Sequence, residues 1–293
     1  MDPQTPIHKS CDLCGGNQYQ AFFTDDSIGG TLVKCQTCGM FYVNNIYNDV
    51  RQQIANSQEL VETPGWAEYK REAVAKHANF VKRYQLLEPY LGPRILEIGC
   101  SAGFFLQVAQ AHGHQVLGIE PDRRYARYAV EQLKVPVMSG LLEKANLPPR
   151  SFDSICMFHV LEHVPSPTRV LEQIYALLRP GGYLILEVPN IDNIWFRLLG
   201  KKWRQFFLGH YYFFGPRTLR MILEKNRYHP ESVRSIGRTV SLRYLAGRVG
   251  RYSSTAARAL EWFVAKARIA ERTVTVNLGD VMIGIATLPD QHE

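Results

Sequence analysis

Residues 94–110 read RILEIGCSAGFFLQVAQ: an apolar run, a turn of small residues, and then a helical pattern. The apolar run, interrupted by Glu97 near its end, predicts a buried parallel strand. Gly99, Ser101 and Gly103 then allow a sharp turn, which leaves the backbone amides at the start of the helix open to a ligand. Because dinucleotide-binding proteins use the same device, this turn alone does not identify the ligand.

A second strand follows at residues 115–119 (QVLGI), and it ends at Glu120. An acidic side chain at this position can accept hydrogen bonds from the hydroxyl groups of a ribose. The order of strand, turn, helix, strand and acid therefore predicts a nucleoside site in an α/β fold.

Four ordered segments make the chain resemble class I S-adenosylmethionine-dependent methyltransferases. Beside the two segments above, these are SFDSICMFHVLEHVPSP at 151–167 and LLRPGGYLILEVPN at 177–190. The resemblance covers about residues 93–190 and implies a Rossmann-like, seven-stranded sheet with helices on both faces. An NAD site fits less well, because its fingerprint requires a third glycine where Phe104 to Leu106 stand.

The resemblance also implies that S-adenosylmethionine is the cofactor. Glu97 would hold its amino-acid end and Glu120 its ribose. Many relatives have aspartate at the position of Leu141, so adenine would here be held by backbone and apolar contacts. The cofactor-binding residues that we expect are Glu97, Gly99, Cys100, Ser101, Gly103, Glu120, Leu141, Leu142 and Phe158.

Two histidines and an acid follow the fourth strand, in the sequence HVLEH at 159–163. A hydroxyl or acidic carbon gains from losing its proton as it receives a methyl group, and histidine titrates near neutral pH. We expect His163 to be the base, with His159 as the second candidate and Glu162 orienting a histidine. Alternatively, Glu162 and His163 share a divalent ion, as in quinone O-methyltransferases with a similar LEHVP segment, or they only organise the loop.

The segment 191–215 after the fifth strand interleaves aromatic and basic side chains, and we expect it to form a lid. Aromatic faces stack on sugar rings, while lysine and arginine bind phosphates. The substrate-binding residues that we expect are His210, Tyr211, Trp203 and Arg204. The alternative is that the aromatic side chains are the core of the lid.

Four of the six cysteines form two Cys-x-x-Cys pairs, Cys11 with Cys14 and Cys35 with Cys38. Each pair is followed by glycine, and this spacing predicts a closed, structural Zn²⁺ site within a ribbon at residues 1–45. A pair of disulfides is disfavoured, because the polar start of the chain shows no signal peptide. We therefore expect a cytoplasmic protein.

The remaining organisation follows from composition. We expect a linker and a helix at 46–92 and a methyltransferase domain at 93–293, with a basic helical insertion at 239–278. Residues 191–272 contain 17 Lys and Arg against 5 Asp and Glu, so the rest of the chain is net acidic. This asymmetry predicts an anionic partner. The insertion would allow contact with the inner face of a membrane, and the alternatives are a homodimer contact or plain packing.

A zinc ribbon ahead of such a core makes the chain similar to sugar C-methyltransferases and polysaccharide-biosynthesis methyltransferases. This implies an acceptor hydroxyl or carbon on a phosphate-bearing sugar, glycan or lipid-linked saccharide. The alternatives are a quinone or other small-molecule O-methyltransferase and an RNA methyltransferase. A nucleic-acid partner is not expected, because no Asn-Pro-Pro-Tyr motif follows the fourth strand.

Overall fold

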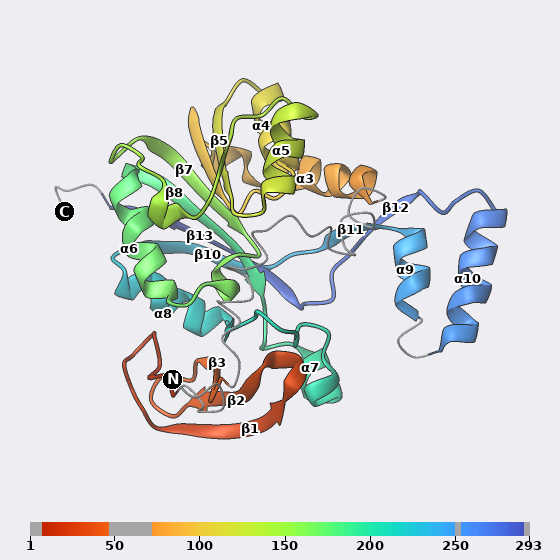
Figure 1. Ribbon diagram of the computed structural model, residues 1–293, viewed down its shortest axis with the longest axis horizontal. Coiled ribbons are helices and arrows are strands. Elements are labelled where there is room, and N and C mark those ends of the chain that lie inside the picture. The colour runs from red at the N-terminus through yellow and green to blue at the C-terminus, as the bar shows by residue number, and fades with distance from the viewer. Residues whose placement is uncertain (1–7, 47–71, 250–252, 290–293) are drawn as a thin grey trace. The chain divides into compact units, whose positions relative to one another are not determined.

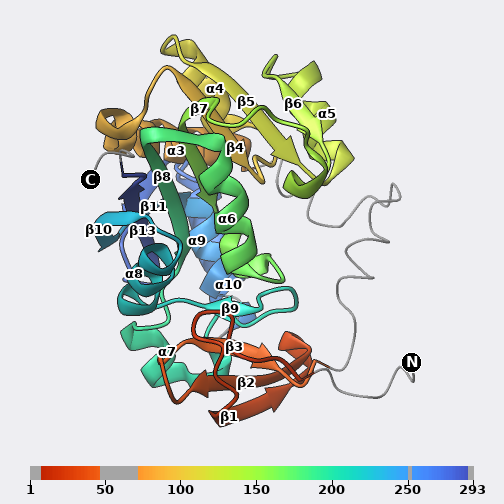
Figure 2. The same ribbon diagram turned by 90° about the vertical axis from the view of Figure 1, so that its left-hand side faces the viewer.

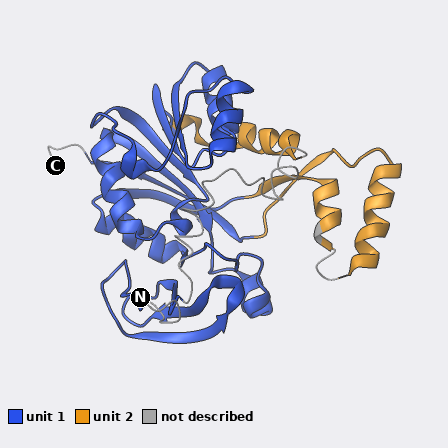
Figure 3. Ribbon diagram, viewed as in Figure 1, with its two compact units in different colours: residues 1–61, 90–236, 279–293 blue, residues 62–89, 237–278 orange. Residues whose placement is uncertain are grey.

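The computed structural model describes residues 8–46, 72–249 and 253–289 (Figure 1). Residues 47–71, which include most of the expected linker, lie outside the described residues. The chain divides into two compact units (Figure 3). Unit 1 comprises residues 1–61, 90–236 and 279–293, and unit 2 comprises residues 62–89 and 237–278. The helix expected before the first strand thus belongs to the same unit as the insertion.

A seven-stranded sheet of order β10-β13-β8-β7-β4-β5-β6 forms the centre of unit 1. Parallel pairs join β6 to β5, β5 to β4, β4 to β7 and β7 to β8, while β13 is antiparallel to both β8 and β10. The strands are β4 (Arg94–Ile98), β5 (Gln115–Glu120), β6 (Val137–Ser139), β7 (Phe152–Phe158), β8 (Leu178–Pro189), β10 (His229–Ser235) and β13 (Val281–Thr287). The predicted Rossmann-like methyltransferase fold is confirmed.

Helices cover both faces of this sheet (Figure 2). Helices α4 (Phe104–Ala111) and α5 (Arg123–Glu131) lie on one face, and α6 (Pro167–Leu177) and α8 (Pro216–Lys225) lie on the other. Single turns of 3₁₀ helix are η1 (Asp26–Ile28), η2 (Glu88–Tyr90), η3 (Leu142–Lys144), η4 (Leu161–His163) and η5 (Gly200–Lys202). The turn η4 begins three residues after the end of β7 and contains Glu162. The end of this strand therefore determines where the carboxylate of Glu162 lies.

A second sheet, of order β1-β2-β3-β9, joins the ribbon to the segment that we expected to be a lid. Its strands are β1 (Tyr19–Asp25), β2 (Gly30–Cys35), β3 (Phe41–Asn44) and β9 (Tyr212–Phe213). The segment 191–215 contributes β9 as well as α7 (Ile194–Leu199). The backbone N–H of Val43 also donates to the Tyr211 carbonyl at 2.8 Å. The sequence did not predict this shared sheet.

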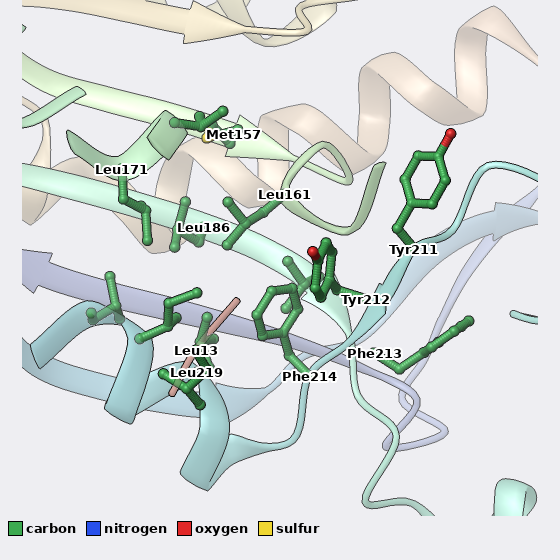
Figure 4. Packing of buried hydrophobic residues seen from close by; sticks show 14 of the residues in the cluster. Leu13, Met157, Leu161, Leu171, Leu186, Tyr211, Tyr212, Phe213, Phe214 and Leu219 are labelled. Carbon is green, nitrogen blue, oxygen red and sulfur yellow. The ribbon is translucent and has the colours of Figure 1, made fainter. Parts of the chain in front are cut away.

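The ribbon is also attached to the main fold by its first cysteine loop. Leu13 is buried in the same hydrophobic core as Leu171 and Leu219, and Figure 4 shows Leu13 beside Leu219. The Asp12 carboxylate accepts hydrogen bonds from the Ser166 hydroxyl at 2.6 Å and from the Thr168 backbone N–H at 2.8 Å. Asp12 therefore helps to cap the N-terminus of α6, where amide donors lack partners within the helix.

The four cysteines of the two pairs lie together at one end of the ribbon. Their sulfur atoms are all within 4.8 Å of one another, with Cys11 and Cys38 at 3.5 Å and Cys14 and Cys35 at 3.5 Å. Burial opposes ionisation of Cys35, but hydrogen bonds from the backbone N–H groups of Cys38 and Thr37 and from Cys14 lower its pKa to about 7. Burial raises the pKa of Cys11 and of Cys38, so of these three cysteines only Cys35 favours the thiolate. The close grouping of four sulfur atoms is compatible with the predicted tetrahedral Zn²⁺ site.

The described residues of unit 2 form three helices and a two-stranded sheet. They are α3 (Ala73–Leu87), β11 (Arg238–Ser241), α9 (Leu242–Arg248), α10 (Ser254–Lys266) and β12 (Thr273–Val276). The Asn79 side-chain oxygen accepts a hydrogen bond from the Thr239 backbone N–H at 2.9 Å, which ties α3 to β11. Among the described helices of the chain, none is both long and apolar enough to cross a bilayer.

We expect the Cys14→Ser, Cys38→Ser variant to lose about one zinc per chain, measured by plasma mass spectrometry. Because a bound metal would hold the ribbon and the ribbon shares a sheet with β9, unfolding should also begin at a lower temperature. A loss of about 2 kcal/mol would lower Tm by roughly 4–8 °C. Cys100→Ala removes a thiol outside the cluster and should retain the zinc. Unchanged metal content in the double variant would contradict the assignment.

Candidate active site

The turn between β4 and α4 has left-handed backbone at alternate residues. The φ angles are 71° at Gly99, 50° at Ser101 and 78° at Gly103. Serine pays a steric cost of about 1–2 kcal/mol in this region, which glycine does not. Space is a second constraint, because a Cβ atom on Gly99 would lie 2.4 Å from a methyl carbon of Val160. The turn therefore approaches the loop after β7 closely enough that only glycine fits.

The carboxylate of Glu120 holds this turn in place. It accepts hydrogen bonds from the backbone N–H groups of Ser101 at 2.7 Å and Asp122 at 2.9 Å. Burial raises the pKa of Glu120 to about 7, although the two amide donors oppose the shift. Glu120 thus lies at the end of β5 with its charge available near neutral pH.

Glu97 is a buried acid that lacks a described partner for one of its oxygens. Its side chain is 2% exposed, and Oε2 accepts no hydrogen bond within the described residues. Burial, followed by the nearby Glu120, raises the pKa of Glu97 well above its usual range. An unsatisfied buried carboxylate is costly, so the site suits a ligand that brings a cation. The amino group of S-adenosylmethionine has that chemistry, and the residues present fit this cofactor.

A cavity of about 430 Å³ extends from the glycine turn to the loop after β7. Gly99, Glu120, Leu141 and Leu142 line it, as do His159 and His163. Phe158, which we also expected to contact the cofactor, is buried with its ring 4.9 Å from that of Phe105. The cavity therefore brings expected cofactor-binding and catalytic residues to one place.

His159 connects two buried carboxylates. Its Nδ1 lies 3.2 Å from Glu162 Oε1, and its Nε2 lies 3.0 Å from Glu187 Oε1. Despite its burial, the pKa of Glu162 is lowered by the hydrogen bond and charge of His159. An ionised Glu162 only accepts hydrogen bonds, so Nδ1 of His159 donates to it, while Nε2 lies against the carboxyl group of Glu187. This geometry favours a positioning role for His159 over that of a base.

His163 has the arrangement that a base requires. Its Nδ1 lies 2.9 Å from the Gly209 carbonyl oxygen, which can only accept, so Nδ1 carries the hydrogen. In the neutral ring the lone pair is then on Nε2. His163 is half-buried and lines the cavity. Of the two histidines, it is the one whose second nitrogen is open to take a proton.

His210 completes a cluster with Glu162 and His163. Its ring centroid lies 4.4 Å from that of His163, and its Nδ1 has no hydrogen-bond partner in the described part of the chain. Burial, followed by the charge of His163, lowers the pKa of His210 to about 3, so the ring is neutral. One ligand atom from each residue lies within 4.8 Å of the others. These three residues could hold a divalent cation. His210 would then be a metal ligand, whereas the sequence led us to expect it to contact the substrate.

The other expected substrate-binding residues lie near this cluster without lining the cavity. Trp203 is 2% exposed and packs against Phe206. The Tyr211 backbone N–H donates to the Glu162 carbonyl at 2.8 Å, and Arg204 forms an ion pair with Asp280. The hydrogen bond from Tyr211 supports the turn that holds Glu162, and contact of these residues with a substrate stays a prediction.

Sequence reasoning did not single out Glu187 or Gly209. Glu187 had a signal, since an acid within the apolar strand LILEVP must find a partner when it is buried. No sequence signal pointed to Gly209, because it contacts His163 through its backbone carbonyl, a group that every residue has.

The comparisons with known proteins agree with the fold. A model of the methyltransferase-domain family matches residues 66–232, which is more than half of the chain. The chain belongs to this family and is an S-adenosylmethionine-dependent methyltransferase.

Curated relatives match a shorter region. A tRNA U34 carboxymethyltransferase of Syntrophotalea carbinolica is 40% identical over 114 residues, which are 36% of this chain and 35% of the relative. A ubiquinone biosynthesis O-methyltransferase of Aeromonas salmonicida is 36% identical over 106 residues, which are 34% of this chain and 44% of the relative. The chain thus spans less than half the length of either relative.

Solved structures support the fold. An S-adenosylmethionine-dependent methyltransferase of Thermotoga maritima has a TM-score of 0.51 and 22% identity, covering 75% of this chain and 94% of its own. Another from Archaeoglobus fulgidus has a TM-score of 0.50 and 20% identity, covering 72% and 94%.

We expect Glu97→Gln to weaken binding of S-adenosylmethionine by about 10–100-fold, measured by calorimetry. The variant loses a charge-assisted hydrogen bond, which is worth about 1.5–3 kcal/mol. Without cofactor, the same variant should melt at a higher temperature at pH 8, because burial raises the pKa of Glu97 and therefore makes the folded chain less stable above the ordinary carboxyl pKa. Glu143→Gln, an equivalent change at an exposed residue lining the cavity, should leave the affinity within about twofold. Equal affinities in all three proteins would exclude Glu97 from the site.

Cofactor affinity should rise between pH 6 and pH 8, because the pKa of Glu120 lies at about 7 and its charged form is the stronger acceptor for ribose hydroxyls. Stability without cofactor should change in the opposite direction. The pKa of Glu120 in the folded chain exceeds the ordinary value of 4.5. The stabilisation by Glu120 is therefore complete below pH 4.5 and is lost as the pH rises through about 7. Calorimetry and thermal melts across this range, with Glu120→Gln as the reference, measure both trends. A pH-independent affinity would contradict the role of Glu120.

Proposed function

We propose that the protein transfers a methyl group from S-adenosylmethionine to a hydroxyl group or acidic carbon that His163 deprotonates. When bound, the cofactor supplies an electrophilic methyl group on a sulfonium. The observation that carries the proposal is the shared cavity, which His163 lines together with Gly99 and Glu120. An acceptor held there would lie between the base and the expected methyl donor.

The surrounding residues suit this proton transfer. The acceptor proton would move to Nε2 of His163, while the Gly209 carbonyl keeps the ring oriented through Nδ1. The imidazolium formed would lie near the fully buried carboxylate of Glu162, whose charge stabilises it more strongly in a dry environment than in water.

For the acceptor we propose a sugar that carries a phosphate group. Exposed cations of the 191–215 segment, Arg197, Lys201 and Lys202, support a phosphate, and sugar hydroxyls suit a histidine base. The resemblance of the ribbon and core to sugar methyltransferases gives the same acceptor class. Methylation at carbon rather than oxygen belongs to the same proposal, because both need removal of a proton.

A hydroxylated aromatic ring is the second candidate. The residues lining the described cavity are mostly apolar and include no lysine or arginine, which favours a flat, uncharged acceptor. The cluster of Glu162, His163 and His210 would then hold a divalent cation that binds the phenolic oxygen. Relatives named for ubiquinone biosynthesis support this acceptor class.

The test is transfer of label from methyl-labelled S-adenosylmethionine by the full chain to three acceptor pools. These are nucleotide sugars, dihydroxylated aromatics and total tRNA, each with EDTA and with added Mg²⁺. We expect label in nucleotide sugars, independent of Mg²⁺. Label only in aromatics, lost with EDTA, would replace the first acceptor with the second. Label only in tRNA would overturn both and favour the activity class of the tRNA-modifying relatives.

We expect His163→Gln to lower kcat about 10²–10⁴-fold while leaving the Kd for S-adenosylmethionine within about twofold. Single-turnover kinetics and calorimetry measure the two quantities. His112→Gln changes an exposed histidine in the loop after α4 and should leave both unchanged. A comparable loss of affinity and of turnover in His163→Gln would show that His163 shapes the cofactor pocket instead.

A further inference from the structure

The helix α10 of unit 2 carries an apolar surface that packing inside the unit leaves open. Ala257 and Val264 are buried on one side of this helix, and Val264 joins Ala246 of α9 in a small hydrophobic cluster. Trp262 is nevertheless 61% exposed and Phe263 57% exposed. Large apolar side chains with this much exposure mark a surface that is covered by something else in the cell.

The exposed side chains lie together on the helix. Successive residues of an α-helix are rotated by about 100°, so Ala259 falls between Trp262 and Phe263 on the surface. Leu260, which is 39% exposed, extends this surface toward the buried side. We call Ala259, Leu260, Trp262 and Phe263 the α10 apolar face.

Cations accompany this face. Residues 242–272 contain seven lysines and arginines against two glutamates. One of the acids, Glu271, is already paired with Arg243. Arg258 and Lys266 are exposed on α10, and Lys266 Nζ lies 4.6 Å over the ring centroid of Trp262. Arg258 therefore flanks the α10 apolar face, and Lys266 lies at the C-terminal end of this face.

We propose that α10 docks on the surface of an anionic phospholipid bilayer. Trp262 and Phe263 would enter the boundary between headgroups and acyl chains, where aromatic side chains are favoured, while Arg258 and Lys266 would meet lipid phosphates. A basic helix with an apolar face is the pattern of interfacial membrane binding.

Charge and side-chain chemistry favour a bilayer over other occupants. In a twofold contact with a second copy, the same cations would face one another across the interface, which is repulsive. Nucleic acid would satisfy the cations but offers little to the aliphatic side chain of Leu260. A bilayer satisfies both kinds of group at once.

The test is sedimentation of the full chain with vesicles of phosphatidylcholine alone or of phosphatidylcholine with about 30% phosphatidylglycerol. We expect the unchanged protein to bind the anionic vesicles. The double variant with Trp262→Ser and Phe263→Ser should bind them at least tenfold more weakly. Arg258→Gln and Lys266→Gln should each weaken binding by about fivefold. Vesicles with brominated acyl chains should quench tryptophan fluorescence of the unchanged protein and quench the double variant less.

Val74→Ser is the matched control, because Val74 is 70% exposed on α3 of the same unit and lies outside α10. It should bind vesicles as the unchanged protein does. All the substituted side chains are exposed, so thermal melts should be unchanged and misfolding would be visible there.

Absence of binding to anionic vesicles would overturn the proposal, as would equal binding by the double variant. A dimer that the double variant disrupts, without vesicle binding, would assign the face to a second copy. RNA binding that depends on Arg258 and Lys266, without vesicle binding, would assign it to nucleic acid. Methyl transfer to soluble acceptors is measured without vesicles, so failure of this inference and failure of the proposed function are separate results.

Discussion

Glu162 is an ionised carboxylate without exposed surface, and its neighbours are arranged to hold that charge. Burying an unpaired carboxylate costs several kcal/mol, so the end of β7 can exist only with a cation or a hydrogen-bond donor beside it. His159 stabilises the charge of Glu162 through Nδ1, and its Nε2 lies 3.0 Å from Glu187 on the adjacent strand β8. The unusual φ of 57° at His159 is the backbone conformation in which one ring reaches both acids. The electrostatics of this trio therefore fix the loop that presents His163 to the cavity.

The ribbon supports the same loop from outside. A run of backbone hydrogen bonds leads from Val43 in β3 to the Tyr211 carbonyl, and from the Tyr211 N–H to the Glu162 carbonyl. The Asp12 carboxylate caps α6, the helix that begins four residues after His163. The first connection ends on the turn that carries Glu162 and His163, and the second ends on the start of the helix that follows this turn. The cysteine module is thus part of the framework of the active site, although its sulfur atoms take no part in the chemistry that we propose.

Most of the main sheet was predictable, because its inner strands are local apolar runs and because the glycine turn follows one of them. The edge strand β10 has the polar sequence HPESVRS, so no apolar run revealed it. The position of Glu120 was predictable for the same reason, since strand ends in a parallel sheet meet at one edge. The partnership of His159 with Glu187 was not, because it depends on the register between β7 and β8. Neither was β9, a strand of only two residues whose pairing with β3 is a long-range contact that no local pattern reveals. The expected roles of Trp203 and Arg204 rested on residue type alone, and type does not distinguish a side chain in a core or ion pair from one in a binding site.

The pairing of β3 with β9 has a consequence for how this chain can be divided. A fragment that starts after the ribbon would leave β9 as an unprotected strand edge, and the hydrophobic surface that Leu13 and Tyr42 cover would face water. Open edges next to apolar surface promote aggregation. The catalytic core is consequently not an autonomous module to which a metal-binding appendage was added, and swapping ribbons between homologous enzymes would require exchanging the residues around 212 as well.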